Sequence, residues 1–225
     1  MLGDCCAYQR AAARQFDRPK AERELAAYHR RGPGLTTRRL LAGLRAVQAT
    51  GTLLDIGAGM GALTFELLAD GIAHADCVEV AGGSLAVAQE EAGRRHLTGH
   101  IAWHEGDFVA IGRHLPPADI VALDKVVCCY PAFGPLLAGA AAHCRRWLAL
   151  SFPRDRWVVR GSIMLENVQR RFRGSAFRGF VHPVDAMDAL LCDAGFRPAH
   201  QSRSFMWHTN IYIRESESAV KAHPD

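Results

Sequence analysis

Three glycines at alternate positions behind an acid are the residues of this chain whose types and spacing best suggest chemistry. Residues 53–61 pass from an apolar run into this group, and an amphipathic segment follows at 62–69. The pattern predicts a buried strand, a tight turn and a helix. Glycine adopts positive φ and exposes bare backbone, while the first N–H groups of a helix can bind an anion. We therefore expect a nucleoside-like ligand with an anionic end, lined by Asp55, Gly57, Ala58, Gly59 and Gly61.

Further acids follow the next two predicted strands. Glu79, with Val80 beside it, stands where a carboxylate can hold ribose hydroxyls. Asp107 can accept a hydrogen bond from an adenine amino group, and the ring of Phe108 can cover the base. The glycine spacing also satisfies the dinucleotide fingerprint, which keeps NAD as an alternative. Asp55 favours S-adenosylmethionine, because its carboxylate can pair with the cationic amino-acid end of that cofactor.

The elements that must position these residues alternate between strand and helix. Strands are predicted at 52–56, 76–80, 100–105, 119–123 and 147–152, and helices at 84–96, 136–144 and 184–194. This alternation predicts an α/β fold with a mostly parallel sheet and helices on both faces. Two extended runs, 199–205 and 207–214, have no helix between them and predict an antiparallel hairpin at the sheet edge. A dinucleotide fold would continue with parallel strands, so the hairpin also favours S-adenosylmethionine.

Two appendages accompany this domain, which we expect to span residues 51–215. Residues 1–50 carry helical signals at 21–31 and 36–49 and predict an N-terminal helical cap. Residues 153–182 insert an arginine- and aromatic-rich segment that resembles a lid. Residues 216–225 are polar and predict a flexible tail.

The composition, with 49% hydrophobic and 22% charged residues, is that of an ordinary soluble globular protein. No apolar stretch approaches the ~18 residues of a membrane helix, so no membrane partner is expected. The net charge of +4 is mild and the clustered arginines lack an aromatic platform, which argues against nucleic acid. The seven cysteines lack zinc-site spacing and the N-terminus lacks a signal-peptide pattern. These features predict reduced thiols, no metal site and a cytoplasmic protein. We expect it to act on a small-molecule acceptor, and the sequence leaves open whether it forms a homodimer.

The glycine turn, Glu79, Gly106-Asp107 and the terminal hairpin together resemble the class I S-adenosylmethionine-dependent methyltransferases, over about residues 50–214. The resemblance implies a Rossmann-like sheet of order 3-2-1-4-5-7-6, with strand seven antiparallel. It implies S-adenosyl-L-methionine as cofactor and S-adenosyl-L-homocysteine as product. By position, Asp55 and the glycines would line the methionine part, Glu79 the ribose, and Asp107 with Phe108 the adenine.

The same resemblance bears on the N-terminal cap. In many of these enzymes a helix pair folds over the cofactor, so that Tyr28 and Arg31 would approach the methionine carboxylate. The alternative is a helix pair that covers the sheet edge, with Tyr28 in the core.

Within these methyltransferases, residues 123–131, 151–154 and 180–183 are similar to the magnesium-protoporphyrin methyltransferases. Cys129 stands where that family has a histidine before Tyr-Pro. The expected function is methyl transfer to an oxygen or nitrogen of a small organic acceptor. A tetrapyrrole carboxylate methyltransferase is one alternative, and a catalytically inactive S-adenosylmethionine-binding module is another.

His182 and Asp124 are the candidate catalytic residues. A general base is needed only where the acceptor is protonated at working pH, and His182 is the first candidate because it ends the insertion. Its alternative is a histidine satisfied within a loop. Asp124, after the fourth strand, can orient the acceptor or the amino group of the cofactor. Cys128 and Cys129 are expected to point to opposite faces of an extended chain and to pack rather than react.

Overall fold

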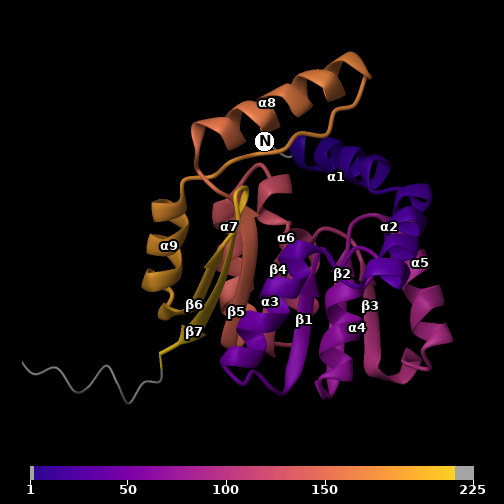
Figure 1. Cartoon of the computed structure of the whole chain (residues 1–225), viewed down its shortest axis with the longest axis vertical. Helices are drawn as coiled ribbons and strands as arrows, with labels where there is room; N and C mark the ends of the chain where they lie inside the picture. The colour runs from indigo at the N-terminus through magenta and orange to yellow at the C-terminus, as the bar shows by residue number, and fades with distance from the viewer. Residues whose placement is uncertain (1–2, 216–225) are drawn as a thin grey trace, which may run out of the picture.

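One mixed β-sheet forms the centre of the molecule (Figure 1). The computed structural model describes residues 3–215, and side chains from residue 8 onward. The strands in this range are β1 Thr52–Ile56, β2 His74–Glu79, β3 Ile101–Glu105, β4 Ala118–Asp124, β5 Cys144–Pro153, β6 Phe196–Arg203 and β7 Trp207–Arg214. Their order is β3-β2-β1-β4-β5-β7-β6, and β7 pairs antiparallel with both β5 and β6. The predicted sheet order and the antiparallel strand seven are confirmed.

Helices cover both faces of the sheet. α3 Leu35–Ala46, α4 Ala62–Ala69 and α5 Gly82–Arg94 pack on one face, and α6 Phe108–Ile111, α7 Phe133–His143 and α9 Val184–Asp193 on the other. α2 Arg18–Arg31 packs on α5, while α1 Gly3–Gln15 and α8 Trp157–Phe172 lie above the carboxyl ends of the parallel strands (Figure 1). Single 3-10 turns are η1 Thr98–His100, η2 Gly112–His114 and η3 Val127–Cys129. Between residues 3 and 215, no helix combines the length and apolarity needed to cross a bilayer.

Neighbouring residues of the central strands enter two different hydrophobic cores. Leu53 and Ile120 pack beneath α3 to α5, whereas Leu54 and Val121 pack beneath α6, α7 and α9. Successive side chains of a strand point to opposite faces, so a strand covered on both sides must be apolar throughout. This explains why the central strands are continuous apolar runs in the sequence.

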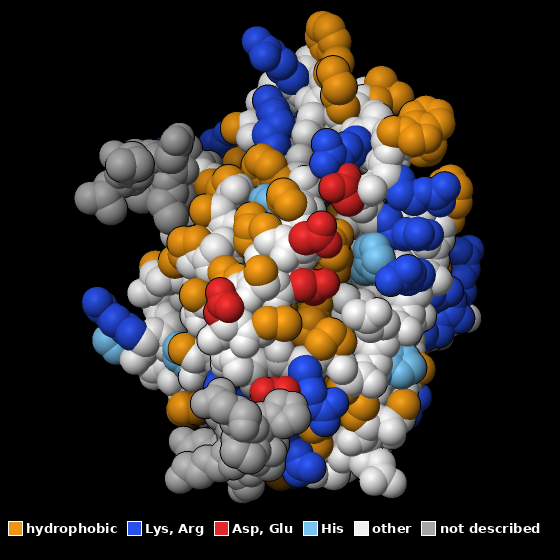
Figure 2. Space-filling model, turned by 90° about the vertical axis from the view of Figure 1, so that its left-hand side faces the viewer, with side chains coloured by type: hydrophobic (Ala, Val, Ile, Leu, Met, Phe, Trp, Pro, Cys, Tyr) orange, Lys and Arg blue, Asp and Glu red, His pale blue; other side chains and the backbone are white. Residues whose placement is uncertain are grey.

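The structure differs from the sequence-based expectation chiefly in the helices α1 and α8, which the sequence does not predict. Several apolar residues of α8 are exposed, Trp157 to 84% and Phe172 to 88%, whereas Val159 is buried. Figure 2 shows hydrophobic and basic side chains gathered at the end of the molecule that carries α8. β6 also begins at Phe196, three residues before its predicted start, directly after Gly195 at φ +81°. The predicted tail, 216–225, lies outside the described residues.

Candidate functional site

The turn between β1 and α4 contains three glycines in the left-handed region. Their φ values are +71° at Gly57, +58° at Gly59 and +87° at Gly61. A Cβ added at Gly57 would lie 2.5 Å from a methyl group of Val126, so the turn packs closely on the loop after β4. A Cβ added at Gly59 would meet nothing within 4 Å. Gly59 therefore presents bare backbone beside open space at the carboxyl end of β1, as a ligand-binding turn requires.

Glu79, at the end of β2, holds this turn from the side. Its Oε2 accepts the Gly59 N–H at 2.9 Å, and its Oε1 accepts the Ala81 N–H at 2.9 Å. Burial raises the pKa of the Glu79 carboxyl, and the backbone N–H donors oppose that rise. Each carboxylate oxygen can accept a second hydrogen bond. Glu79 can therefore support the turn and bind hydroxyl groups at the same time. Ala58 shares this anchoring, because its N–H and that of Gly57 both donate to the carbonyl of Val78.

Asp55 lies beneath the turn, where its side chain is almost fully buried. Its Oδ2 accepts a hydrogen bond of 2.7 Å from the hydroxyl of Thr64 on α4. Burial raises the pKa of Asp55 to about 7, although the Thr64 hydrogen bond acts in the opposite direction. The carboxyl thus titrates near neutral pH, where an approaching cation would favour its ionised form.

Asp107 accepts hydrogen bonds from the helix it begins and from two distant parts of the chain. It caps α6 by accepting the Val109 N–H, and it accepts hydrogen bonds of 2.9 Å from the Tyr130 hydroxyl and 3.3 Å from the Gln9 amide. Gln9 is 98 residues away in sequence. No local pattern signals that Gln9 or Tyr130 belongs to this cluster, because the contacts depend on how α1 and the loop after β4 come together.

Phe108 and Val80 lie on different sides of this region. The Phe108 ring packs in the core, with its centroid 5.5 Å from that of His143 on α7, and this placement favours a core role over contact with adenine. Val80 packs against the small apolar cluster of Ala11, Ala12 and Phe177. α1 therefore packs against Val80, the residue directly after the carboxyl end of β2.

Asp124, at the end of β4, connects three elements. Its two carboxylate oxygens accept hydrogen bonds of 2.5 Å from Thr37 on α3 and 2.5 Å from Ser151 on β5. The Ser151 hydroxyl oxygen in turn accepts the Lys125 N–H at 2.8 Å. Lys125 has a φ of +63°, so this network holds an unfavourable backbone conformation next to the glycine turn.

His182 contacts the loop after β4 rather than open space. Its Nε2 lies 2.9 Å from the carbonyl oxygen of Tyr130 and 3.1 Å from that of Val127, so this nitrogen donates to backbone. The ring contacts those of Phe133 and Phe180, with centroid distances of 5.0 Å and 5.8 Å. This arrangement favours a structural role for His182, in which its hydrogen bonds are satisfied within a loop, over a role as general base.

The two candidate residues of the N-terminal cap, Tyr28 and Arg31, differ in burial. Tyr28 is buried in the core beneath α3 to α5; its hydroxyl donates to Glu66 at 2.8 Å and accepts from Arg95 at 3.3 Å. Arg31 is exposed at the end of α2. The structure thus favours the alternative in which Tyr28 is a core residue.

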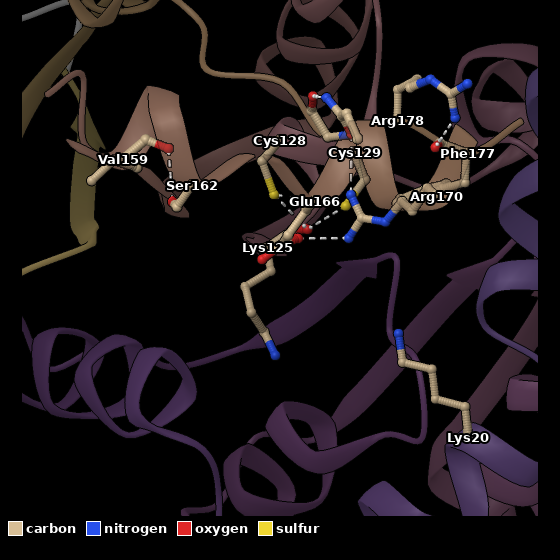
Figure 3. Close-up of polar contacts among 12 residues, drawn as sticks. Lys20, Lys125, Cys128, Cys129, Val159, Ser162, Glu166, Arg170, Phe177 and Arg178 are labelled. Carbon is tan, nitrogen blue, oxygen red and sulfur yellow. Dashed lines mark hydrogen bonds and ion pairs between the residues drawn. The ribbon is translucent and has the colours of Figure 1, made fainter. Parts of the chain in front are cut away.

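The prediction that Cys128 and Cys129 point to opposite faces is wrong. Both lie in η3, and their sulfur atoms are 3.7 Å apart (Figure 3). A 3-10 turn rotates successive side chains by about a third of a turn, not the half turn of an extended strand. Among the side chains that the structure describes, no group of three or more His, Cys, Asp and Glu is arranged to hold a metal ion.

Solved structures with the same fold give this geometry a context. No family model and no curated protein matches the chain at a significant level. Magnesium protoporphyrin IX methyltransferase from Synechocystis PCC 6803, solved with bound SAH, superposes with a TM-score of 0.64 over 80% of this chain and 82% of its own, at 22% identity. The chain has the class I methyltransferase fold. A putative sarcosine dimethylglycine methyltransferase from Galdieria sulphuraria (TM-score 0.62, 15% identity, 80% of this chain and 85% of that one) shares it. A putative RNA methyltransferase from Pyrococcus horikoshii also shares the fold, with a TM-score of 0.57 and 20% identity over 84% of this chain and 86% of that one.

Proposed function

We propose that this chain is an S-adenosylmethionine-dependent methyltransferase that acts on an oxygen or nitrogen of a small organic acceptor. The observation that carries the proposal is the pairing of Glu79 with the open backbone of Gly59 at the carboxyl ends of β1 and β2. Ligands of open α/β sheets bind at this edge, near the point where the strand order reverses. The named acceptors of proteins with this fold are varied, so the fold supports methyl transfer more strongly than it supports any one acceptor.

The residues present fit the cofactor. Gly59 leaves space for a close approach, and Glu79 has acceptor capacity for ribose hydroxyls. Asp107 stands at the expected adenine position, where its carboxylate already accepts hydrogen bonds from Val109, Tyr130 and Gln9. The buried Asp55 supplies a negative charge when a cation is near, because its pKa is about 7. When bound, S-adenosylmethionine would supply an electrophilic methyl group on a sulfonium. The protein's part is to hold the acceptor in line with that methyl group, and Asp124 stands at the end of β4 where it can orient either partner.

A second candidate is methylation of a carboxylate on an apolar body such as a tetrapyrrole. A groove of about 460 Å³ runs between α8 and residues 178–181, and it is lined by Arg160, Arg171, Arg178, Ile163, Phe180 and Val181 among others. Guanidinium groups beside apolar side chains fit an acidic, hydrophobic acceptor. A carboxylate is already ionised at neutral pH and needs no general base. This agrees with a positioning role for His182.

Calorimetric titration with S-adenosylhomocysteine and with NADH tests the proposal. We expect S-adenosylhomocysteine to bind and NADH not to bind; binding of NADH alone would end the proposal. Glu79→Gln removes a charged acceptor and is expected to weaken binding by ~1.5–3 kcal/mol. Glu105→Gln is the matched control, because Glu105 is exposed and lies opposite Glu79 on β3. Binding without any labelled product from a pool of metabolites and labelled S-adenosylmethionine would favour the inactive binding module.

A further inference from the structure

Two adjacent thiols lie side by side at the carboxyl end of β4. Their sulfur atoms are 3.7 Å apart, and each donates a hydrogen bond of 3.3 Å to the carbonyl oxygen of Lys125 (Figure 3). Cys128 is buried, whereas Cys129 is partly exposed. We propose that Cys128 and Cys129 form a vicinal dithiol that a hydroperoxide oxidises reversibly to an intramolecular disulfide.

The surroundings of Cys129 favour the thiolate form. When Cys129 is ionised, the Cys128 thiol can turn from the Lys125 carbonyl and donate to the Cys129 sulfur 3.7 Å away. The cations of Lys20, Arg170 and Lys125 act on the same sulfur from α2, α8 and the residue after β4. These groups lower the pKa of Cys129, first through the Cys128 hydrogen bond and then through the positive charges, against the effect of burial. Cys129 is therefore the attacking sulfur, and Cys128 is the resolving thiol.

Two other cysteines of the chain provide a contrast. Cys77 and Cys144 are buried, and no hydrogen bond joins either of them to another thiol among the side chains that the structure describes. Burial raises the pKa of both, to about 12 for Cys144. A buried neutral thiol is inert toward peroxide, because the thiolate is the nucleophile.

The reaction balances in two steps. The Cys129 thiolate attacks one peroxide oxygen, so that an S–O bond forms, the O–O bond breaks and the leaving oxygen departs with a proton as water or an alcohol. The Cys128 sulfur then attacks the sulfur of the Cys129 sulfenic acid, forming the S–S bond, while the S–O bond breaks and the oxygen leaves as water. Two thiols are oxidised and one hydroperoxide is reduced.

The product should be easy to reduce. Adjacent Cα atoms are about 3.8 Å apart, below the range of about 4.4–6.8 Å found for ordinary disulfides. A disulfide forced away from its preferred geometry is more reducible, so a dithiol reagent should restore both thiols.

The test is mass spectrometry of the full chain treated with hydrogen peroxide. We expect a loss of about 2 Da, reversed by dithiothreitol. Trypsin then releases residues 126–145, which hold Cys128, Cys129 and Cys144. Fragmentation of that peptide should locate the link between Cys128 and Cys129. A link to Cys144, a link between chains, or no loss of mass would overturn the proposal.

Three variants sharpen the result. Cys144→Ser is the matched control and should still lose about 2 Da. Cys129→Ser should not form the link, and Cys128→Ser should instead accumulate a sulfenic acid at Cys129 that dimedone traps. Loss of the same mass from this tryptic peptide in Cys129→Ser would contradict the assigned pair. The wild-type peptide map decides the proposal even where a variant folds poorly.

Discussion

The Tyr130 hydroxyl donates a hydrogen bond of 2.9 Å to Oδ2 of Asp107, which connects the loop after β4 to the loop after β3. The two residues are 23 positions apart, and both are buried. The Tyr8 ring of α1 packs edge-on against the Tyr130 ring, with centroids 5.1 Å apart. The expected adenine acceptor therefore belongs to a structural network that extends from α1 to β4.

Removing this hydroxyl should destabilise the protein measurably. A buried hydrogen bond to a charged group contributes ~1.5–3 kcal/mol, so Tyr130→Phe should lower the free energy of unfolding by about that amount. Urea unfolding of Tyr130→Phe, Asp107→Asn and the double variant measures the coupling. Strictly additive losses would show that the hydrogen bond contributes nothing.

The two glycines of the turn should respond differently to alanine. Gly59→Ala should cost ~1–2 kcal/mol of stability for its left-handed backbone and should weaken S-adenosylhomocysteine binding, because the methyl group enters open space. Gly57→Ala should cost more, since its Cβ would lie 2.5 Å from Val126. Adding Val126→Ala to Gly57→Ala should restore part of the loss in a urea titration. An equal cost at both glycines would contradict the packing described for the turn.

Asp55 should make stability depend on pH. Its folded-state pKa of about 7 lies above that of an unfolded aspartate, so the folded state retains a proton that the unfolded state loses. The resulting stability is fully present below about pH 4 and disappears as the pH rises through 7. Asp55→Asn stays neutral, so its stability relative to wild type should rise between pH 5 and 8, by about 2–3 kcal/mol. Urea midpoints across this range provide the check, and a constant difference would refute the assignment.

His182 should behave as a positioning group. Its Nε2 donates to the carbonyl oxygens of Val127 and Tyr130, so His182→Ala should lower the free energy of unfolding by ~1–3 kcal/mol. His182→Asn retains an N–H donor and should recover part of this loss. Chemical denaturation of the two variants measures both free energies of unfolding. If His182→Ala were as stable as wild type, His182 would again be a candidate general base.

The strands and the glycine turn were predictable because their signals are local. The apolar run at β1 reflects a strand covered on both faces, and the extended run at β7 follows the preceding one without a helix; both strands occupy their predicted residues. Gly57, Gly59 and Gly61 reflect a backbone conformation that only glycine adopts cheaply. The amphipathic pattern of α8 is present in the sequence, but the sequence does not indicate how the helix packs: Val159 is buried, whereas Trp157 and Phe172 stay exposed.

The contacts among functional side chains depended on tertiary structure. Thr37 and Ser151 meet on Asp124 from positions 87 and 27 residues away, and Tyr28 turns from a candidate ligand into a core residue through its contact with Glu66. Even the adjacent Cys128 and Cys129 needed the 3-10 turn to bring their sulfurs together.

The amino-acid sequence alone determined the succession of strands and helices along the chain and the glycine turn, since both follow from backbone conformation and burial within short segments; the order of strands in the sheet was expected only from the family resemblance. Only the tertiary structure decided which side chains meet at the carboxyl edge of the sheet. Those contacts join segments far apart in the chain, and no short-range periodicity encodes the distance between them.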